Sequence, residues 1–253
     1  MILGIDVGNT NIVAALVNEN GIYKEYRYFT DKQESNLYHI KHLETLVDNQ
    51  ELDGIMISSV VPEINDCLKQ ACVALTGQSP IFACAELKTG LDIKYDNPKK
   101  LGADLITAAV GTVRKYGSPA AIVDIGTATT LCVINEKNEY LGGMIAPGPF
   151  TSMKALAATA SQLPEIELTA TDKVIGTNTV DCMKIGILTA HAAMIDGMLN
   201  RVIDSLKLNN VQLIATGGRC EDITNMCVHK MVCDKDLIFY GLYELYKMNC
   251  NGI

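Results

Sequence analysis

Two short polar segments, each directly after an apolar run, carry the residue types that could bind a phosphate group. The first is Asp6-Val7-Gly8-Asn9-Thr10-Asn11, and the second begins at Asp124 in "DIGTATT". A glycine after a strand lets the backbone approach a ligand, and exposed N–H groups and hydroxyls donate to anionic oxygens. A carboxylate beside such a turn would repel phosphate, so Asp6 and Asp124 are suited to holding Mg²⁺, its waters or another cation.

A plain hairpin turn would use the same residue types, because Asp, Gly and Asn are common in turns. The pattern occurs twice, however, which favours the phosphate interpretation. Laying "LGIDVGNTNIVAALV" on "AIVDIGTATTLCVIN" pairs four positions: Asp6 with Asp124, Gly8 with Gly126, Thr10 with Ala128 and Asn11 with Thr129. The sequence lacks G-x-x-x-x-G-K-[ST] and G-x-G-x-x-G, so nucleotide binding would depend on these paired turns.

The elements that must position the two turns repeat along the chain. Each half is predicted to begin with three strands: 2–7, 12–17 and 22–29 in the first, and 120–125, 130–134 and 139–146 in the second. Helices are predicted near 35–49, 62–76, 101–116, 149–160, 177–206 and up to about 248, with further strands at "DGIMISSVVP", 211–216 and 228–232. This order predicts an α/β protein with two related lobes, 1–116 and 117–253.

Composition sets limits on the kind of protein. The 253 residues are 48% hydrophobic and 20% charged, as in a folded globular chain. The net charge of -8 without a Lys/Arg cluster argues against nucleic-acid binding. The start lacks a leader-like apolar segment, so a cytoplasmic protein without a membrane partner is expected.

Cysteine and histidine spacing predicts neither disulfides nor zinc. Nine cysteines without a C-x-x-C pair indicate reduced, mostly buried thiols. His39 and His42 lie three apart on a predicted helix and could form half of a metal site. Without a matching Cys or His pair, a surface helix is the favoured interpretation.

An ordered set of motifs gives the chain a resemblance to a known family. The set comprises "DVGNTN" from Asp6, "SSVVP" at 58–62, "YDNPKKLGAD" at 95–104, "DIGTATT" at 124–130, "GGMIAPG" at 142–148, "LP" at 163–164, "GTNT" at 176–179 and "TGG" at 216–218. Nearly end to end, the chain resembles the type III pantothenate kinases of the acetate and sugar kinase, Hsp70 and actin superfamily. The resemblance implies two lobes of the actin-like ATPase (ribonuclease H-like) fold, each a mixed sheet with flanking helices.

The resemblance also implies an activity, which is the ATP-dependent phosphorylation of pantothenate to 4'-phosphopantothenate, the first step of coenzyme A biosynthesis. In the implied site the first turn binds the ATP phosphates, with Asp6 holding Mg²⁺ through water, and Thr127 also contacts ATP. Asp124 would hold a monovalent cation, K⁺ or NH₄⁺. The ATP-binding set is Asp6, Val7, Gly8, Asn9, Thr10, Asn11 and Thr127.

Asp104 is the implied catalytic base. It follows Gly102-Ala103 at a predicted helix start, where the helix dipole favours an ionised carboxylate. From this residue alone, an ordinary first-turn acid would be the better interpretation. The resemblance implies a pantothenate pocket made of Tyr95, Gly102, Ala103, Asp104, Leu105 and Thr179.

One position departs from the family pattern. The family has arginine after G-A-D, whereas this chain has Leu105, which offers neither charge nor donor to the pantothenate carboxylate. Lys99, Lys100 or another cation could substitute, the affinity could be lower, or the substrate could lack that carboxylate. Two alternatives therefore stay open, a non-catalytic regulator that binds a nucleotide or metabolite and a superfamily kinase of another small alcohol.

The long predicted helix at 177–206 bears on association. It has apolar residues on more than one face, including Met183, Ile187, Ala190, Met194 and Met198. Such a helix is either deeply buried or shared with a second subunit. The resemblance implies a homodimer.

Overall fold

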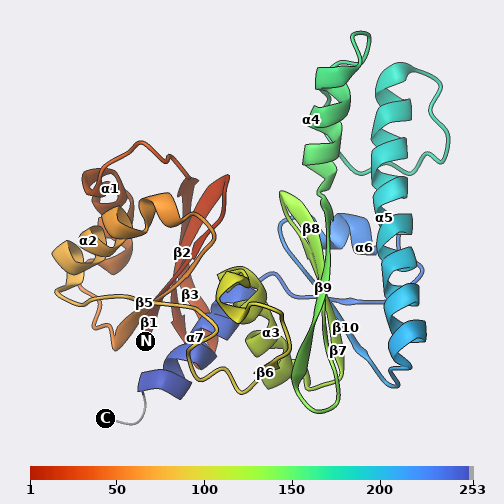
Figure 1. Cartoon of the computed structure of the whole chain (residues 1–253). Coiled ribbons are helices and arrows are strands. Elements are labelled where there is room, and N and C mark those ends of the chain that lie inside the picture. The colour runs from red at the N-terminus through yellow and green to blue at the C-terminus, as the bar shows by residue number, and fades with distance from the viewer. Residues whose placement is uncertain (251–253) are drawn as a thin grey trace. The chain divides into compact units, whose positions relative to one another are not determined.

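The computed structural model describes residues 1–250 and divides into two compact units (Figure 1). The first unit contains residues 1–117, the short segment Asn138–Tyr140 and the C-terminal segment from Asp236. The second contains Ser118–Lys137 and Leu141–Lys235. Residues 251–253, which the sequence assigns to the second lobe, lie outside the described residues.

The first unit is built on a five-stranded sheet in the order β3-β2-β1-β4-β5. Its strands are β1 (Ile2–Val7), β2 (Asn11–Asn18), β3 (Gly21–Phe29), β4 (Gly54–Ser59) and β5 (Ile81–Phe82). β1 pairs antiparallel with β2 and parallel with β4. The sequences "ILGIDV" and "GIMISS" are almost continuously apolar, as expected for strands that are covered on both faces.

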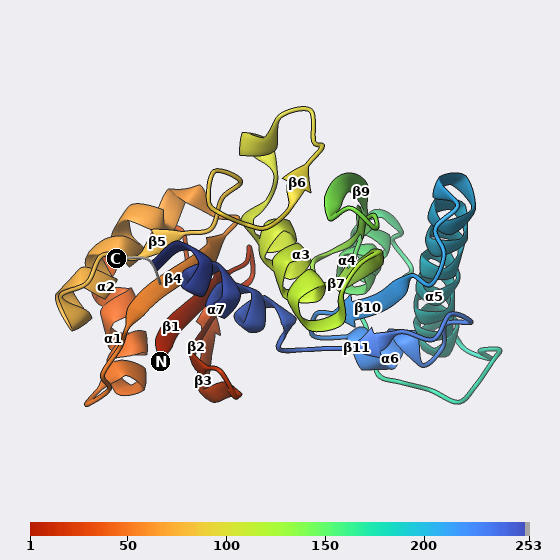
Figure 2. The same ribbon diagram turned by 90° about the horizontal axis from the view of Figure 1, so that it is seen from below.

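Helices cover both faces of this sheet (Figures 1 and 2). The unit's helices are α1 (Asn36–Val47), α2 (Asn65–Thr76), α3 (Ala103–Tyr116) and α7 (Leu237–Cys250), with 3-10 turns at Pro62–Ile64 and Pro98–Lys100. One face of β1, which carries Leu3 and Ile5, forms a core with residues of α1 and α2. On the other face, a side chain at Gly4 would contact Phe239 and Leu242 of α7.

The placement of α7 differs from the predicted lobe boundary. The sequence assigns everything after residue 116 to the second lobe, but α7 packs against β1, β4 and α3 in the first unit. Two glycines allow the close crossing of α3 and α7. A Cβ on Gly241 would clash with the carbonyl oxygen of Thr107, and one on Gly111 would lie 2.7 Å from that of Leu237.

The second unit repeats the plan of the first. Its strands are β7 (Ala120–Ile125), β8 (Ala128–Ile134), β9 (Glu139–Pro147), β10 (Gln212–Thr216) and β11 (Val232–Cys233). β7 pairs antiparallel with β8 and parallel with β10, as β1 does with β2 and β4. The two predicted three-strand starts are therefore confirmed. A short strand, β6 (Asp92–Ile93), pairs with the start of β9 at Glu139 and Tyr140.

The helices of the second unit are α4 (Pro149–Thr159), α5 (Thr179–Leu206) and α6 (Cys220–Thr224). Leu188, Ile195 and Leu199 of α5 pack with Val123 and Leu131 of the sheet. Within residues 1–250, α5 is the one helix that is long and apolar enough to cross a membrane, by length and composition only. Core packing accounts for the face of α5 that lies against the sheet, whereas Ala190 on the same helix is exposed.

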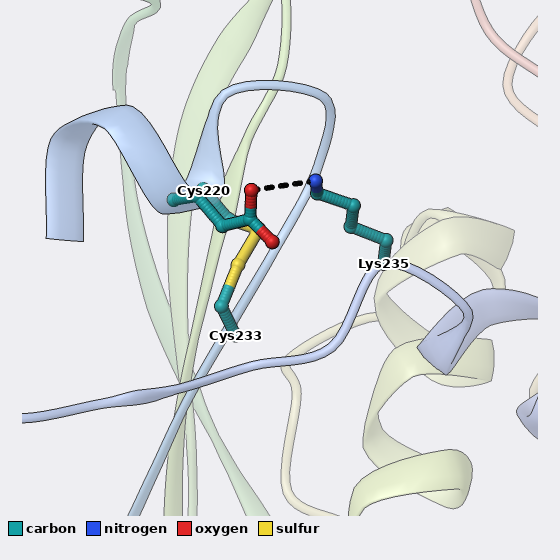
Figure 3. Close-up of a disulfide and its surroundings, with 4 residues drawn as sticks. Cys220, Cys233 and Lys235 are labelled. Carbon is teal, nitrogen blue, oxygen red and sulfur yellow. Dashed lines mark ion pairs between the residues drawn. A yellow bond between two sulfur atoms is a disulfide. The ribbon is translucent and has the colours of Figure 1, made fainter. Parts of the chain in front are cut away.

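Cys220 and Cys233 form a disulfide with their Cα atoms 5.9 Å apart (Figure 3). The expectation of reduced thiols is wrong for this pair and agrees with the structure for the seven free cysteines. The expectation that they are mostly buried is wrong, because only three of the seven, Cys72, Cys132 and Cys227, are buried. Cys233 lies opposite Ala215 in the β10–β11 pairing, and the turn after β10 brings Cys220 back beside it. A spacing of 13 residues does not indicate this arrangement in the sequence. Lys235 and Glu221 form an ion pair of 2.8 Å next to the disulfide (Figure 3).

The predicted surface helix with two histidines is α1, but His39 is fully buried. Its Nδ1 lies 3.3 Å from the Tyr28 hydroxyl, and the ring of His42 stacks on Tyr28 with centroids 4.6 Å apart. Burial lowers the pKa of His39 to about 4. These histidines belong to an aromatic cluster at the β3–α1 contact.

Candidate active site

The first turn, between β1 and β2, is held by backbone and side-chain hydrogen bonds. The N–H of Gly8 donates to the carbonyl oxygen of Asn11 (3.0 Å), and the Thr30 hydroxyl donates to that of Gly8 (2.7 Å). Asn9 and Thr10 at the tip are exposed. The turn therefore presents its tip to solvent, as a phosphate-binding loop requires. Sequence reasoning missed Thr30, since a lone threonine after a strand is no signal by itself.

Asp6, at the end of β1, has an unusual electrostatic environment. It lies opposite Val13 in β2 and Ser58 in β4. Burial, and secondly the negative charge of Asp104, raise the pKa of Asp6 to about 7, while the Ser58 hydroxyl and Arg27 act in the opposite direction. The structure thus brings Asp6 and Asp104 close enough to interact. A divalent cation would relieve this repulsion, so the two carboxylates fit a metal-bearing site.

Asp104 lies in the first turn of α3, as predicted. The N–H of Leu105 donates to its Oδ1 at 2.8 Å. This bond lowers the pKa of Asp104, but burial acts more strongly and raises it overall. The shift is therefore opposite to the one that the helix dipole alone predicts, because the partly buried carboxyl loses hydration.

The second turn, between β7 and β8, is supported by the segment that precedes α4. The N–H of Gly148 donates to the carbonyl oxygen of Thr127 (3.0 Å), and the Thr151 hydroxyl donates to the same oxygen (2.6 Å). A Cβ on Gly148 would clash with the carbonyl oxygen of Gly126. The glycine that ends "GGMIAPG" thus allows this close backbone approach.

Asp124, at the end of β7, lies against the turn that follows β10. Thr216 is its neighbour in the β10–β7 pairing, and Gly217 has a φ of +92°. A Cβ on Gly217 would lie 2.6 Å from Oδ1 of Asp124 and 2.5 Å from the carbonyl oxygen of Ile125. The "TGG" motif therefore lies directly against the second turn, and of its two glycines only Gly217 is required by the close approach.

The two turns differ in length by one residue. In the first, Val7 pairs with Ile12 and leaves four residues between them, whereas in the second Ile125 pairs with Thr129 and leaves three. The sequence alignment of Asn11 with Thr129 is therefore wrong by one position, because it assumes equal turns. The structural counterpart of Thr129 is Ile12, and both side chains are fully buried.

The predicted pantothenate residues divide between the two units. Gly102, Ala103, Asp104 and Leu105 are consecutive at the start of α3, and Tyr95 is 40% exposed just after β6. Thr179 is exposed at the start of α5 in the second unit. The binding roles of these residues stay predictions.

Each unit contains a cavity. One cavity of about 590 Å³ is lined by the ends of α1 and α2 and by the segments that follow them, and it holds none of the predicted site residues. Another, of about 530 Å³, is lined by α4 and α5. Within residues 1–250, no group of three or more His, Cys, Asp or Glu side chains is placed to hold a metal ion.

Two sheets of the same plan, each with a glycine turn after its first strand, define the ATPase fold that acetate and sugar kinases share with Hsp70 and actin. A Campylobacter jejuni structure described as a Baf family transcriptional activator has a TM-score of 0.64 at 20% identity and covers 99% of this chain and 100% of that chain. A ROK family glucokinase from Streptomyces griseus, solved with glucose and AMPPNP, has a TM-score of 0.55 at 13% identity and covers 99% of each chain. At these identities the likeness shows the fold alone.

Sequence comparison identifies the family. The profile described as type III pantothenate kinase matches residues 2–201. The type III pantothenate kinase of Halalkalibacterium halodurans is 41% identical over 254 residues, which cover 98% of this chain and 100% of the relative. The chain belongs to the type III pantothenate kinase family, and it is a kinase.

Proposed function

We propose that the chain transfers the γ-phosphoryl group of ATP to the 4'-hydroxyl of pantothenate, with Asp104 as the catalytic base. The family supports pantothenate phosphorylation, and with it the entry step of coenzyme A biosynthesis. The observation that supports the site is the position of Asp104 at the start of α3, where its negative charge reaches Asp6 beside the first turn.

In this proposal Asp104 orients the hydroxyl of pantothenate and accepts its proton during transfer. Phosphoryl transfer depends mainly on positioning and charge stabilisation, and a carboxylate is the usual group for this task. The raised pKa of Asp104 makes it a stronger base than a solvated aspartate. The bond from the Leu105 N–H fixes one carboxylate oxygen, so the other can face the substrate.

The first turn is proposed to bind the ATP phosphates through residues 6–11. A kinase of this family uses ATP with a divalent metal, and we propose Mg²⁺ held through water by Asp6. Bound Mg²⁺ would neutralise phosphate charge. Because protonated Asp6 cannot serve this role well, a pKa of about 7 in the ligand-free protein predicts that MgATP binding displaces a proton from Asp6.

In the second unit, we propose that Thr127 contacts ATP and that Asp124 holds a monovalent cation, K⁺ or NH₄⁺. Asp124 ends a strand beside two turns, so backbone carbonyl oxygens are available next to its carboxylate. Carboxylate and carbonyl oxygens are the donors that such cations prefer. Replacing K⁺ with Na⁺ in an activity assay tests this assignment.

The pantothenate pocket is proposed to contain Tyr95, Gly102, Ala103, Leu105 and Thr179. Leu105 stands where the family has arginine, and we propose that another cation compensates by meeting the pantothenate carboxylate. Lys99 lies 3.7 Å from Glu86 in an exposed pair, and Lys100 is its exposed neighbour in the turn before α3.

The carboxylate assignment is tested by the steady-state kinetics of Leu105→Arg. A fall in the KM for pantothenate is expected if this position faces the carboxylate, and an unchanged KM would refute that placement. Lys100→Gln in the parent background should raise the KM if Lys100 compensates. Lys99→Gln is the matched control, because it removes the neighbouring positive charge and leaves Lys100 in place.

One assay panel tests the proposed function. ATP turnover is measured with pantothenate and with related small alcohols, and Asp104→Asn is expected to lower kcat by about 10² to 10⁴. Asp66→Asn, an exposed carboxylate in the first turn of α2, is the control and should leave kcat unchanged. Turnover with another alcohol alone would support the alternative kinase, and nucleotide binding without any turnover would support the regulator.

We also propose that the protein is a cytoplasmic homodimer without nucleic-acid or membrane partners. Ala190 of α5 is exposed, and Val174 and Ile175, just before α5, are 85% and 79% exposed. An apolar surface of this kind is typical of an association face. Light scattering should give twice the chain mass of 27.4 kDa, and a monomer mass would contradict the dimer.

A further inference from the structure

A buried polar pair lies directly behind the second turn. The hydroxyl oxygen of Thr129, at the start of β8, is 2.7 Å from Nε2 of His191 in the middle of α5. Their exposed fractions are 0% and 4%. Thr129 is the residue that closes the turn, because it pairs with Ile125 across the three turn residues.

The first unit shows that core packing does not require a polar residue at this position. There the counterpart is Ile12, which is fully buried in an apolar core. Burying a hydroxyl and an imidazole gives little net stability over an apolar pair of the same shape, and each group becomes costly when its partner is removed. The pair must therefore serve orientation rather than hydrophobic stability.

His191 is suited to a fixed orienting role. Burial lowers its pKa, so the ring is neutral at pH 7 and carries one N–H. One directional bond then fixes the side chain of Thr129, and with it the first residues of β8. From the other side, Gly148 and Thr151 hold the carbonyl oxygen of Thr127. The turn is thus clamped between α5 and the start of α4.

We propose that His191 is a positioning residue for the phosphate turn, which sets the geometry of residues 124–130 through Thr129. The inference rests on the proposed role of this turn in binding ATP and a monovalent cation. Loss of the bond should loosen the turn and weaken binding of both, while the pantothenate hydroxyl and its base are unaffected. His191 acts through Thr129 and is not itself expected to contact ATP.

The test compares His191→Leu with His191→Gln and Thr129→Val in the full-length protein. His191→Leu should raise the KM for ATP about tenfold, and it should raise the K⁺ concentration for half-maximal activation by the same factor. A tenfold change in a binding constant corresponds to the free energy of about one buried hydrogen bond. The kcat at saturation should change less than about twofold. His191→Gln keeps a hydrogen-bonding amide at similar reach and should restore most of the loss. The double variant with Thr129→Val should be no worse than either single variant, because one bond links the two residues.

His39→Leu is the matched control, because His39 is also buried but lies in the first unit. It should leave both constants unchanged. The proposal is overturned if His191→Leu folds with unchanged constants, or if His39→Leu raises them equally. If His191→Leu does not fold, Thr129→Val takes its place as the variant that lacks the bond. Its KM for ATP and its K⁺ constant should then exceed those of His191→Gln.

A readout without ligand separates this proposal from the proposed function. The amide resonances of Gly126 and Thr127 should shift in Thr129→Val relative to the parent protein and should stay unshifted in His39→Leu. If the parent protein neither binds nor turns over ATP, the proposed function fails while this measurement still tests the positioning role. Unshifted turn amides in Thr129→Val would overturn the positioning role regardless of activity.

Discussion

Raising the pH from 5 to 8 is expected to destabilise the ligand-free protein through Asp6. Burial and the charge of Asp104 raise the pKa of Asp6 from 3.8 to about 7. The folded state therefore binds this proton more tightly than the unfolded chain, and the resulting stabilisation is complete below pH 4 and lost as the pH rises through 7. Since pH 5 lies two units below the folded pKa, the loss between pH 5 and 8 is about 2 to 3 kcal/mol.

The assay is urea unfolding of the parent protein and Asp6→Asn at pH 5, 6, 7 and 8, followed by circular dichroism. The free energy of unfolding of the parent protein should fall by this amount between pH 5 and pH 8. That of Asp6→Asn should not show this fall, because asparagine does not titrate. Asp66→Asn, an exposed substitution, should keep the parent slope. An Asp6→Asn profile as steep as that of the parent would refute the raised pKa. Saturating MgATP should reduce the slope, because it favours ionised Asp6.

Three further outcomes follow from packing and cross-links. Gly241→Ala should lower the free energy of unfolding by about 3 kcal/mol, because its Cβ meets the Thr107 carbonyl oxygen at the α3–α7 crossing. Gly197→Ala in α5, where a Cβ meets no atom within 4 Å, should raise it by about 0.5 to 1 kcal/mol; a loss would indicate a contact at that face. Reduction of the Cys220–Cys233 disulfide should cost about 3 kcal/mol for its loop of 13 residues. Mass spectrometry of acid-quenched protein should find that bond, and free thiols at both positions would contradict it.

Local sequence patterns predicted the elements that carry the site. Alternating and continuous apolar runs identified the strands that start each unit, and the strand–glycine–strand pattern placed both turns. The helix start at Asp104 followed from the residues around it. These features depend on neighbours within a few positions, so a single sequence contains the necessary information.

Features that depend on distant partners were not predicted. Helix α7 belongs to the first unit because glycines on α3 and α7 permit close packing, and the chain order suggests the opposite. Thr129 and His191 are 62 positions apart, and neither residue type alone signals the bond. The pairing of Cys220 with Cys233 likewise depends on the parallel register of β10 and β11.

The duplicated plan carries different chemistry in its two copies, and the differences are local. In the first copy, the residue that closes the turn is the apolar Ile12, and the residue before the turn, Asp6, interacts with a second carboxylate, Asp104. Behind the second turn, Thr129 and His191 form a buried polar contact. A carboxyl with a pKa near 7 can release its proton near neutral pH when a cation binds beside it, whereas a turn fixed by a directional bond keeps one geometry. In the proposed function the first turn would respond to MgATP and the second would keep a fixed binding geometry, although both follow the same strand–turn–strand pattern.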